Sequence, residues 1–228
     1  MVERALVLYS GGKDSHYALL KAISQGYNVE KLLVVSPLRS DSWLFHSVNI
    51  EWCLLHAKLL GIDYTVLYSS GVKDREVFEL RRKLEELRSA GFKYVVSGVI
   101  ASNYQKSRVD SICSDLDMVH VTPLWSYDPH TLLLEEVRSL GFIITAIQAY
   151  GLNSTWLGSV LNLNNLESFV SNCIKHGINF VGEGGEFETY VIKSPLFGQR
   201  SICVRSSRKV WHPNHWVGYL IIEDAGIC

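Results

Sequence analysis

Short apolar runs alternate with amphipathic stretches through the first half of the chain. Residues Arg4 to Tyr9 predict a buried strand, and the apolar spacing from Ser15 to Ser24 fits one face of a packed helix. The same alternation then repeats. Further strands are predicted at 31–35, 64–67, 94–96 and 118–121, and further helices at 50–60, 75–89 and 105–116. This pattern predicts a parallel sheet covered by helices on both faces, an α/β domain.

The pattern changes in the second half. A helix at 131–140 and a strand at 142–147 continue the alternation. After Asn153, a helix at 166–176 leads into a glycine-rich stretch and then into segments typical of an antiparallel meander. Those segments are 201–204, 209–211 and 216–222. We therefore predict an α/β domain over residues 1–125 and a smaller α+β domain over 126–228.

Composition narrows the class of protein. With 228 residues and 47% hydrophobic content, the chain can bury a sizeable core. No apolar run approaches the roughly 20 residues of a membrane span, and no signal peptide precedes the first strand, so we expect no membrane and a cytoplasmic location. The net charge of -1 makes nucleic-acid binding unlikely on global grounds. Five scattered cysteines without a C-x-x-C pair favour reduced, mostly buried thiols.

The first strand ends in a loop suited to phosphate. Its residues are Ser10, Gly11, Gly12, Lys13, Asp14 and Ser15. The glycines let main-chain donors approach phosphate oxygens, the serine hydroxyls add hydrogen bonds, and Lys13 adds positive charge. A Mg²⁺ that bridges carboxylate and phosphates explains Asp14, which could alternatively only cap the helix. We expect Lys13 and Asp14 at a loop edge, although a Gly-Gly turn can also be a mere connector.

Two further segments carry candidate chemistry. Residues 97–108 follow a strand and open a helix, where Arg108 could clamp phosphate or carboxylate. The alternative is a serine-rich helix start with a solvated arginine. Residues 182–189 place three carboxylates in a glycine-rich stretch, where they could coordinate Mg²⁺, orient ammonia or hold a cationic substrate. An acidic turn is the alternative, but three glycines in eight residues favour a tight bend or a ligand.

These motifs resemble a known family. SGGKDS directly after the first strand is similar to the loop of the N-type ATP pyrophosphatases, or PP-loop enzymes. Together with residues 98–108, Pro123-Leu124-Trp125, GEGGEFET and Ser194-Pro195-Leu196-Phe197, it resembles the diphthine–ammonia ligase family over nearly the whole chain. The resemblance implies a Rossmann-like (adenine nucleotide alpha hydrolase-like) PP-loop domain followed by a small substrate domain.

The resemblance also implies an activity, its cofactors and its partners. ATP with Mg²⁺ would adenylate the carboxylate of diphthine on translation elongation factor 2, and ammonium would then replace AMP to give an amide. No glutaminase module fits beside these regions in this length, so free ammonium is the implied nitrogen source unless a partner delivers it. A homodimer is a further guess.

Site residues follow from the same resemblance. Catalysis is assigned to Lys13, Asp14, Arg108, Glu183 and Glu186, and the metal to Asp14. Nucleotide binding is assigned to Ser10, Gly11, Gly12, Lys13, Asp14, Ser15, Ser36 and Gly98. Acceptor binding is assigned to Ser42, Trp43, His46, Ser102, Tyr104, Gln105, Glu183, Glu186, Glu188 and Thr189. Residues 209–228 match no family motif.

Two other functions stay open on the sequence. A tRNA-modifying PP-loop enzyme could use Arg200, Arg205, Arg208 and Lys209 as an RNA-binding face, although a solvated strand surface explains these charges equally well. The missing C-x-x-C pair speaks against thiolation. The other alternative is a nucleotide-binding regulatory module that keeps the loop without turnover.

Overall fold

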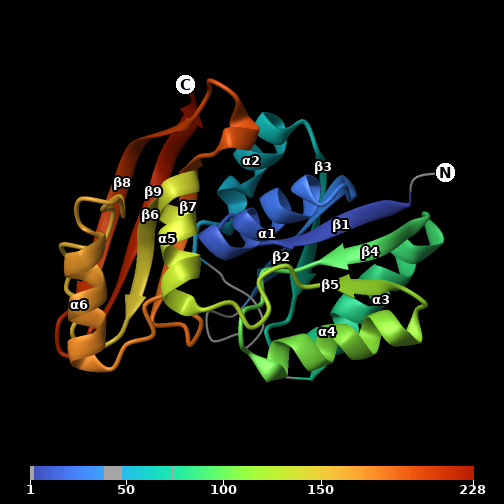
Figure 1. Ribbon diagram of the computed structural model, residues 1–228, viewed down its shortest axis with the longest axis horizontal. Helices are drawn as coiled ribbons and strands as arrows, with labels where there is room; N and C mark the ends of the chain where they lie inside the picture. The colour runs from blue at the N-terminus through green and yellow to red at the C-terminus, as the bar shows by residue number, and fades with distance from the viewer. Residues whose placement is uncertain (1–2, 39–47, 73) are drawn as a thin grey trace. The chain divides into compact units, whose positions relative to one another are not determined.

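The computed structural model describes residues 3–38, 48–72 and 74–228, which divide into two compact units (Figure 1). The first unit comprises the residues up to Ser10 and Asp14–Ser126, and the second comprises Gly11–Lys13 and Tyr127–Cys228. The middle of the glycine loop therefore packs with the second unit, while its two ends pack with the first.

A parallel sheet forms the centre of the first unit. Its five strands are β1 (Arg4–Tyr9), β2 (Asn28–Pro37), β3 (Asp63–Ser69), β4 (Phe92–Val96) and β5 (Val119–Val121), in the order β3-β2-β1-β4-β5. Each pair of neighbours is parallel. The connecting helices are α1 (Lys13–Ser24), η1 (Ile50–Trp52), α2 (Cys53–Leu60), α3 (Arg75–Ser89) and α4 (Asn103–Asp115). The predicted α/β architecture is confirmed, and the strand order reverses between β1 and β4.

Burial explains why these segments form strands and helices. The central strands are near-continuous apolar runs, as expected for a sheet covered on both faces, and Leu6, Leu33 and Val95 are fully buried. In α3, Leu80 and Leu84 lie one helical turn apart and pack into the same core. Helix α2 ends at Gly61, whose left-handed φ of 65° confirms the predicted stop.

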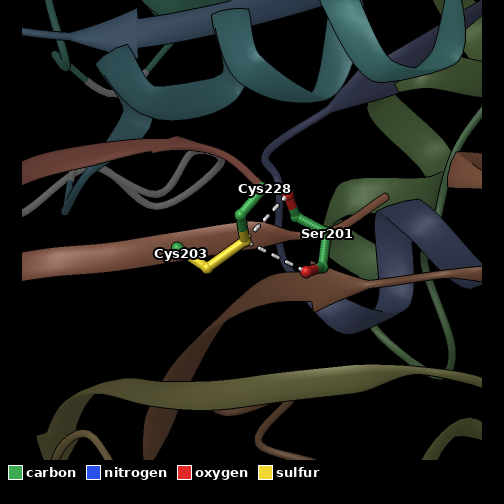
Figure 2. The surroundings of a disulfide bond; sticks show 3 residues. All are labelled: Ser201, Cys203 and Cys228. Carbon is green, nitrogen blue, oxygen red and sulfur yellow. Dashed lines mark hydrogen bonds between the residues drawn. A yellow bond between two sulfur atoms is a disulfide. The ribbon is translucent and has the colours of Figure 1, made fainter. Parts of the chain in front are cut away.

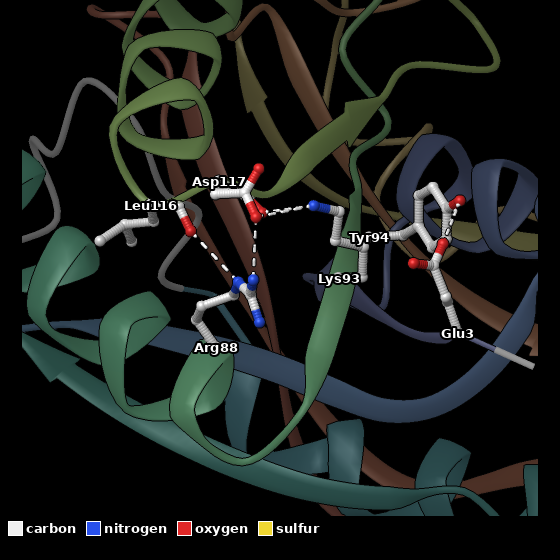
Figure 3. Close-up of polar contacts among 6 residues, drawn as sticks. All are labelled: Glu3, Arg88, Lys93, Tyr94, Leu116 and Asp117. Carbon is white, nitrogen blue, oxygen red and sulfur yellow. Dashed lines mark hydrogen bonds and ion pairs between the residues drawn. The ribbon is translucent and has the colours of Figure 1, made fainter. Parts of the chain in front are cut away.

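Ion pairs close the sheet edge at which β4 begins (Figure 3). Asp117, in the turn between α4 and β5, accepts from Arg88 at 2.9 Å and from Lys93 at 3.0 Å. Beside them, the hydroxyl of Tyr94 donates to Glu3 at 2.7 Å. The charged side chains at this edge of the sheet are paired with one another. In parallel sheets, ligands usually bind at the opposite edge, where the strands have their carboxyl ends.

An antiparallel sheet forms the second unit. Its strands are β6 (Gly141–Gln148), β7 (Phe187–Lys193), β8 (Ile202–His212) and β9 (Val217–Ile227), in the order β7-β6-β9-β8. Helices α5 (Pro129–Ser139) and α6 (Leu166–His176) and the short η2 (Pro195–Phe197) complete it. The predicted smaller α+β region is confirmed.

Two details of the second-unit prediction are wrong. Strand β6 does not continue the parallel alternation, because it pairs antiparallel with β7 and β9. The predicted strands 201–204 and 209–211 are one strand, β8, which pairs with β9 as a hairpin. Register shifts around Ser206 and exposed polar side chains hide this continuity from an apolar-periodicity argument. A sheet-edge strand tolerates such charged, solvent-facing positions.

The expectation that all five cysteines are reduced is also wrong. Cys203, early in β8, and Cys228, just after β9, form a disulfide (Figure 2). Ser201 and Cys228 exchange two backbone hydrogen bonds of 2.9 and 3.0 Å, and the Ser201 hydroxyl lies 3.3 Å from Cys228 Sγ. Antiparallel pairing of β8 with β9 brings together thiols that are 25 residues apart. The remaining cysteines, Cys53, Cys113 and Cys173, are buried as expected.

Within the described ranges, we find no helix with the length and apolar character needed to cross a membrane.

Candidate active site

The carboxyl ends of β1 and β4 mark the point where the strand order reverses, which is where open α/β sheets bind ligands. The glycine loop follows β1 directly. The Ser10 N–H donates to Ser15 Oγ at 3.2 Å, and the two hydroxyl oxygens lie 3.1 Å apart, so the two ends of the loop are tied together. Gly11 has a φ of 77°, which favours glycine.

Helix α1 begins inside this loop, at Lys13, two residues earlier than predicted. The N–H groups of a first helical turn point out of the helix end, where the helix dipole favours anions. Hydroxyls of Ser10 and Ser15 stand at the same end of the helix. This donor set suits a phosphate chain, so the chemistry of the residues fits ATP.

Gly98 lies against this helix end. A Cβ at position 98 would come within 2.7 Å of the carbonyl carbon of Asp14 and of the Ser15 nitrogen, both backbone atoms. Because neither atom can move without shifting α1, only glycine fits. The structure thus brings Gly98 together with the loop, as the sequence motifs imply.

Lys13 is not at a loop edge, contrary to expectation, since only 1% of it is exposed. Its Nζ donates to the Val181 carbonyl at 2.8 Å and lies 3.2 Å from Glu136 Oε2 on α5. Glu136 is fully buried, and the Phe187 ring centroid is 5.9 Å from Nζ. A buried ammonium and a buried carboxylate therefore neutralise each other within the second unit.

Backbone contacts hold the loop middle on β7. The Lys13 N–H donates to Thr189 Oγ1 at 3.0 Å, and the Val191 N–H donates to the Gly11 carbonyl at 2.9 Å. Thr189 closes the predicted acceptor segment, residues 182–189. The loop and this segment, about 170 residues apart in the chain, thus meet within the second unit.

The glycine-rich segment bends sharply before β7. Gly182 and Gly185 have φ values of 78° and 82°. Glu186 Oε1 accepts from the Asn179 N–H at 3.3 Å, whereas its buried Oε2 has no hydrogen-bond partner among the described residues. An unsatisfied buried carboxylate oxygen needs a donor, which a ligand can supply. Glu183 and Glu188 are half-buried.

Metal binding requires converging ligands. In the parts of the chain that the structure describes, no group of three or more His, Cys, Asp or Glu side chains is arranged to hold a metal ion. The three glutamates of 182–189 therefore form no carboxylate cage. Mg²⁺ bound with ATP commonly uses one or two carboxylates plus phosphate oxygens, which the half-buried Asp14 fits.

The remaining predicted site residues are spread over two elements. Ser102 caps α4 by accepting from the Gln105 N–H at 3.3 Å. The Arg108 guanidinium lies 4.7 Å from the Tyr104 ring centroid, so it stacks along its own helix. Ser36 lies near the carboxyl end of β2 and is half-buried. The predicted acceptor residues Ser42, Trp43 and His46 lie outside the described residues.

Sequence reasoning missed the partners of the loop. Glu136 follows Leu132 and Leu133 by four and three residues, so it continues the buried stripe of α5, but its neighbour Glu135 makes the pair look like a solvated surface. His16 was missed as well. The Tyr9 hydroxyl lies 2.7 Å from His16 Nδ1, which joins the residues on either side of the loop. Burial, and then His56, lower the pKa of His16 well below its usual value, so it is neutral.

Comparison with known proteins identifies the family. The model of the diphthamide synthase N-terminal domain matches residues 3–120, and that of the C-terminal domain matches 128–227. A Danio rerio protein named diphthine–ammonia ligase is 30% identical over 230 residues, covering 92% of this chain and 89% of its own length. The Mus musculus protein of the same name is 29% identical, covering 92% and 85%.

One solved structure is remotely similar. It is described as a predicted subunit of tRNA methyltransferase from Methanocaldococcus jannaschii, with 15% identity and a TM-score of 0.47 over 84% of this chain and 97% of that one. Nothing about activity follows from so remote a likeness. The two family models, by contrast, match the chain almost from end to end, and the protein therefore belongs to the diphthamide synthase family.

Proposed function

We propose that this chain is an AMP-forming diphthine–ammonia ligase. It adenylates the carboxylate of diphthine on translation elongation factor 2, and ammonia then replaces AMP to give diphthamide. The observation that carries the proposal is the loop Ser10–Ser15, whose hydroxyls and helix end stand where the strand order reverses.

The first half of the reaction needs pyrophosphate to leave. We propose that Ser10, Gly11, Gly12 and Ser15 bind the β- and γ-phosphates of ATP, with Gly98 packed against the loop. Asp14 would hold Mg²⁺, which neutralises phosphate charge when it is bound.

The two basic residues of the candidate site, Lys13 and Arg108, have different proposed roles. Because Lys13 Nζ is held by Glu136 and the Val181 carbonyl, we propose that Lys13 serves catalysis by fixing the loop. Arg108 stacks on Tyr104 through weak contacts of its own helix, so its guanidinium remains the proposed clamp for the phosphate or the acceptor carboxylate. Ser36 would contact the nucleotide.

The second half of the reaction needs ammonia. We propose that Glu186 binds ammonium, because its buried Oε2 lacks a hydrogen-bond donor among the described residues and a carboxylate favours a cation. Glu183, Glu188 and Thr189, on the same segment of the second unit, would contact the diphthine side chain. For the first unit, Ser102, Tyr104 and Gln105 at the start of α4 stay proposed as acceptor-binding residues.

We place the PP-loop domain at residues 1–125, the substrate domain at 126–228 and the enzyme in the cytoplasm, with elongation factor 2 as its protein substrate. A homodimer is proposed only as the simplest assembly.

The test incubates the protein with ATP, ammonium and diphthine-bearing elongation factor 2. AMP should accumulate, and the modified histidine should show the mass change from carboxylic acid to amide. ATP binding without AMP would select a regulatory module instead. Steeply salt-dependent tRNA binding with AMP formation on tRNA would select the tRNA-modifying alternative.

A further inference from the structure

Next to Gly98, the side chains of Ser97, His120 and Asp110 in the first unit form a hydrogen-bonded relay. Ser97 directly follows β4, His120 lies on β5 and Asp110 on α4. Ser97 Oγ is 2.8 Å from His120 Nε2, and His120 Nδ1 is 2.7 Å from Asp110 Oδ1. Lys106, one turn earlier on α4, donates to the other Asp110 oxygen at 2.6 Å. The relay thus ties three elements together at the carboxyl edge of the sheet.

The protonation states follow from the surroundings of each group. Burial raises the pKa of Asp110, but hydrogen bonds from Lys106 and His120 outweigh it and hold the pKa below its usual range. Burial lowers the pKa of His120, and the hydrogen bond and charge of Asp110 offset this only in part, with the Lys106 charge lowering it further. At neutral pH, an ionised Asp110 therefore faces a neutral His120.

These states fix the direction of each hydrogen bond. An ionised carboxylate only accepts, so His120 Nδ1 carries the proton and donates to Asp110. Nε2 is then an acceptor, and the Ser97 hydroxyl donates to it. Because 8% of Ser97 and 3% of the His120 side chain are exposed, solvent does little to replace a lost bond.

The backbone carries this constraint to the loop. The Ser97 N–H donates to the Val121 carbonyl at 3.0 Å. The backbone N–H and the side-chain hydroxyl of Ser97 are thus both hydrogen-bonded to residues of β5. The next residue is Gly98, whose α-carbon packs so tightly on Asp14 and Ser15 that a Cβ would lie 2.7 Å from their backbone. A shift at Ser97 is therefore a shift of the surface on which the loop rests.

We infer that His120 is a positioning residue for ATP binding: the relay of Asp110, His120 and Ser97 holds Gly98 against Asp14–Ser15. The inference rests on the proposed function, which assigns the loop to the phosphates of ATP. The hydrogen bonds of His120 run to Ser97 and Asp110, so its proposed action on the loop passes through Ser97. Protonation of Nε2 would convert this acceptor into a donor, and the Ser97 hydroxyl would then accept the hydrogen bond.

The test compares Ser97→Ala, His120→Phe and their double variant by equilibrium binding of ATP in the full chain. Each single change should weaken ATP binding about fivefold to tenfold, the range of one buried hydrogen bond, and the double should be no weaker than the worse single. Amides at residues 97–100 should exchange faster with deuterium in all three. Asp63→Asn, which breaks an exposed pair with Lys31 in the same sheet, is the matched control and should change neither readout.

His120→Gln separates positioning from general packing. Its amide offers both a donor and an acceptor, so ATP affinity should recover toward that of the unmodified chain. Multiplicative losses in the double variant, unchanged exchange at 97–100, or an ATP affinity of His120→Gln as low as that of His120→Phe would each overturn the inference. If the unmodified chain forms no AMP, the proposed ligase activity fails, while exchange at 97–100 still decides the relay.

Discussion

Replacing Lys13 by Met should destabilise the second unit strongly. The change removes an ammonium that is 1% exposed and leaves the fully buried Glu136 without its counter-charge at 3.2 Å. Removing one member of a buried ion pair costs about 3–5 kcal/mol, because the remaining charge stays desolvated. The free energy of unfolding of a whole domain is about 5–15 kcal/mol, so the variant should lose a large share of its stability.

Urea unfolding measures this cost, with Arg75→Met as the matched control. Arg75 and Glu79 are separated by the same 3.2 Å, but Arg75 is 71% exposed. An exposed pair of this kind contributes about 0.3–0.5 kcal/mol to the free energy of unfolding, so Arg75→Met should cost far less than Lys13→Met. The two pairs have the same separation and differ in burial.

The double variant Lys13→Met with Glu136→Leu distinguishes charge from packing. Apolar residues of similar size often replace a buried ion pair without loss of stability, so the double variant should recover most of the unfolding free energy. A Lys13→Met cost no larger than that of the control would refute the reasoning. So would a double variant that remains as unstable as the single one.

Further predictions concern the loop, the disulfide and pH. Gly98→Ala should lower AMP formation at least tenfold, on the order of 1.4 kcal/mol, because its Cβ meets the backbone of Asp14 at 2.7 Å; normal steady-state rates would count against this contact. Asp14→Asn should reduce AMP formation by orders of magnitude while the urea midpoint stays unchanged, and retained turnover would remove Asp14 from the site. Cys203→Ser should lower stability by about 2–4 kcal/mol, measured by thermal unfolding without reductant, and an equal effect under reductant would argue against the disulfide. Burial raises the pKa of Asp110, but hydrogen bonds from Lys106 and His120 outweigh it and lower that pKa in the folded protein. Ionised Asp110 therefore stabilises the fold above its unfolded-state pKa, and this stabilisation is lost as pH falls through its folded-state pKa. Asp110→Asn should flatten this acid decline in urea midpoints, and an unchanged decline would contradict the assignment.

Local patterns were enough to predict the first unit. Its strands are apolar runs separated by amphipathic helices, and Gly61 marks a helix end by its left-handed conformation. Strand direction in the second unit was harder to predict. β6 has the same buried apolar pattern as a parallel strand, and only its partners β7 and β9, distant in sequence, make it antiparallel. The disulfide was missed for the same reason, since pairing register, not spacing, brings Cys203 to Cys228.

The candidate site was predictable in part. The loop motif after a strand predicts phosphate binding, which stays a prediction, and a close backbone approach explains Gly98. Burial of individual polar groups was not predictable, because it depends on tertiary packing. Lys13 reads as a solvent-facing cation and is instead enclosed with Glu136. His120 has no motif at all, and only pairing of β4 with β5 places it beside Ser97.

The most direct test of the central claim follows the nitrogen. Ammonium labelled with nitrogen-15 is supplied with ATP and diphthine-bearing elongation factor 2, and AMP is counted alongside label in the modified histidine. An AMP-forming ligase should transfer one labelled nitrogen for each AMP released. AMP without label in the factor, or label without AMP, would contradict the account.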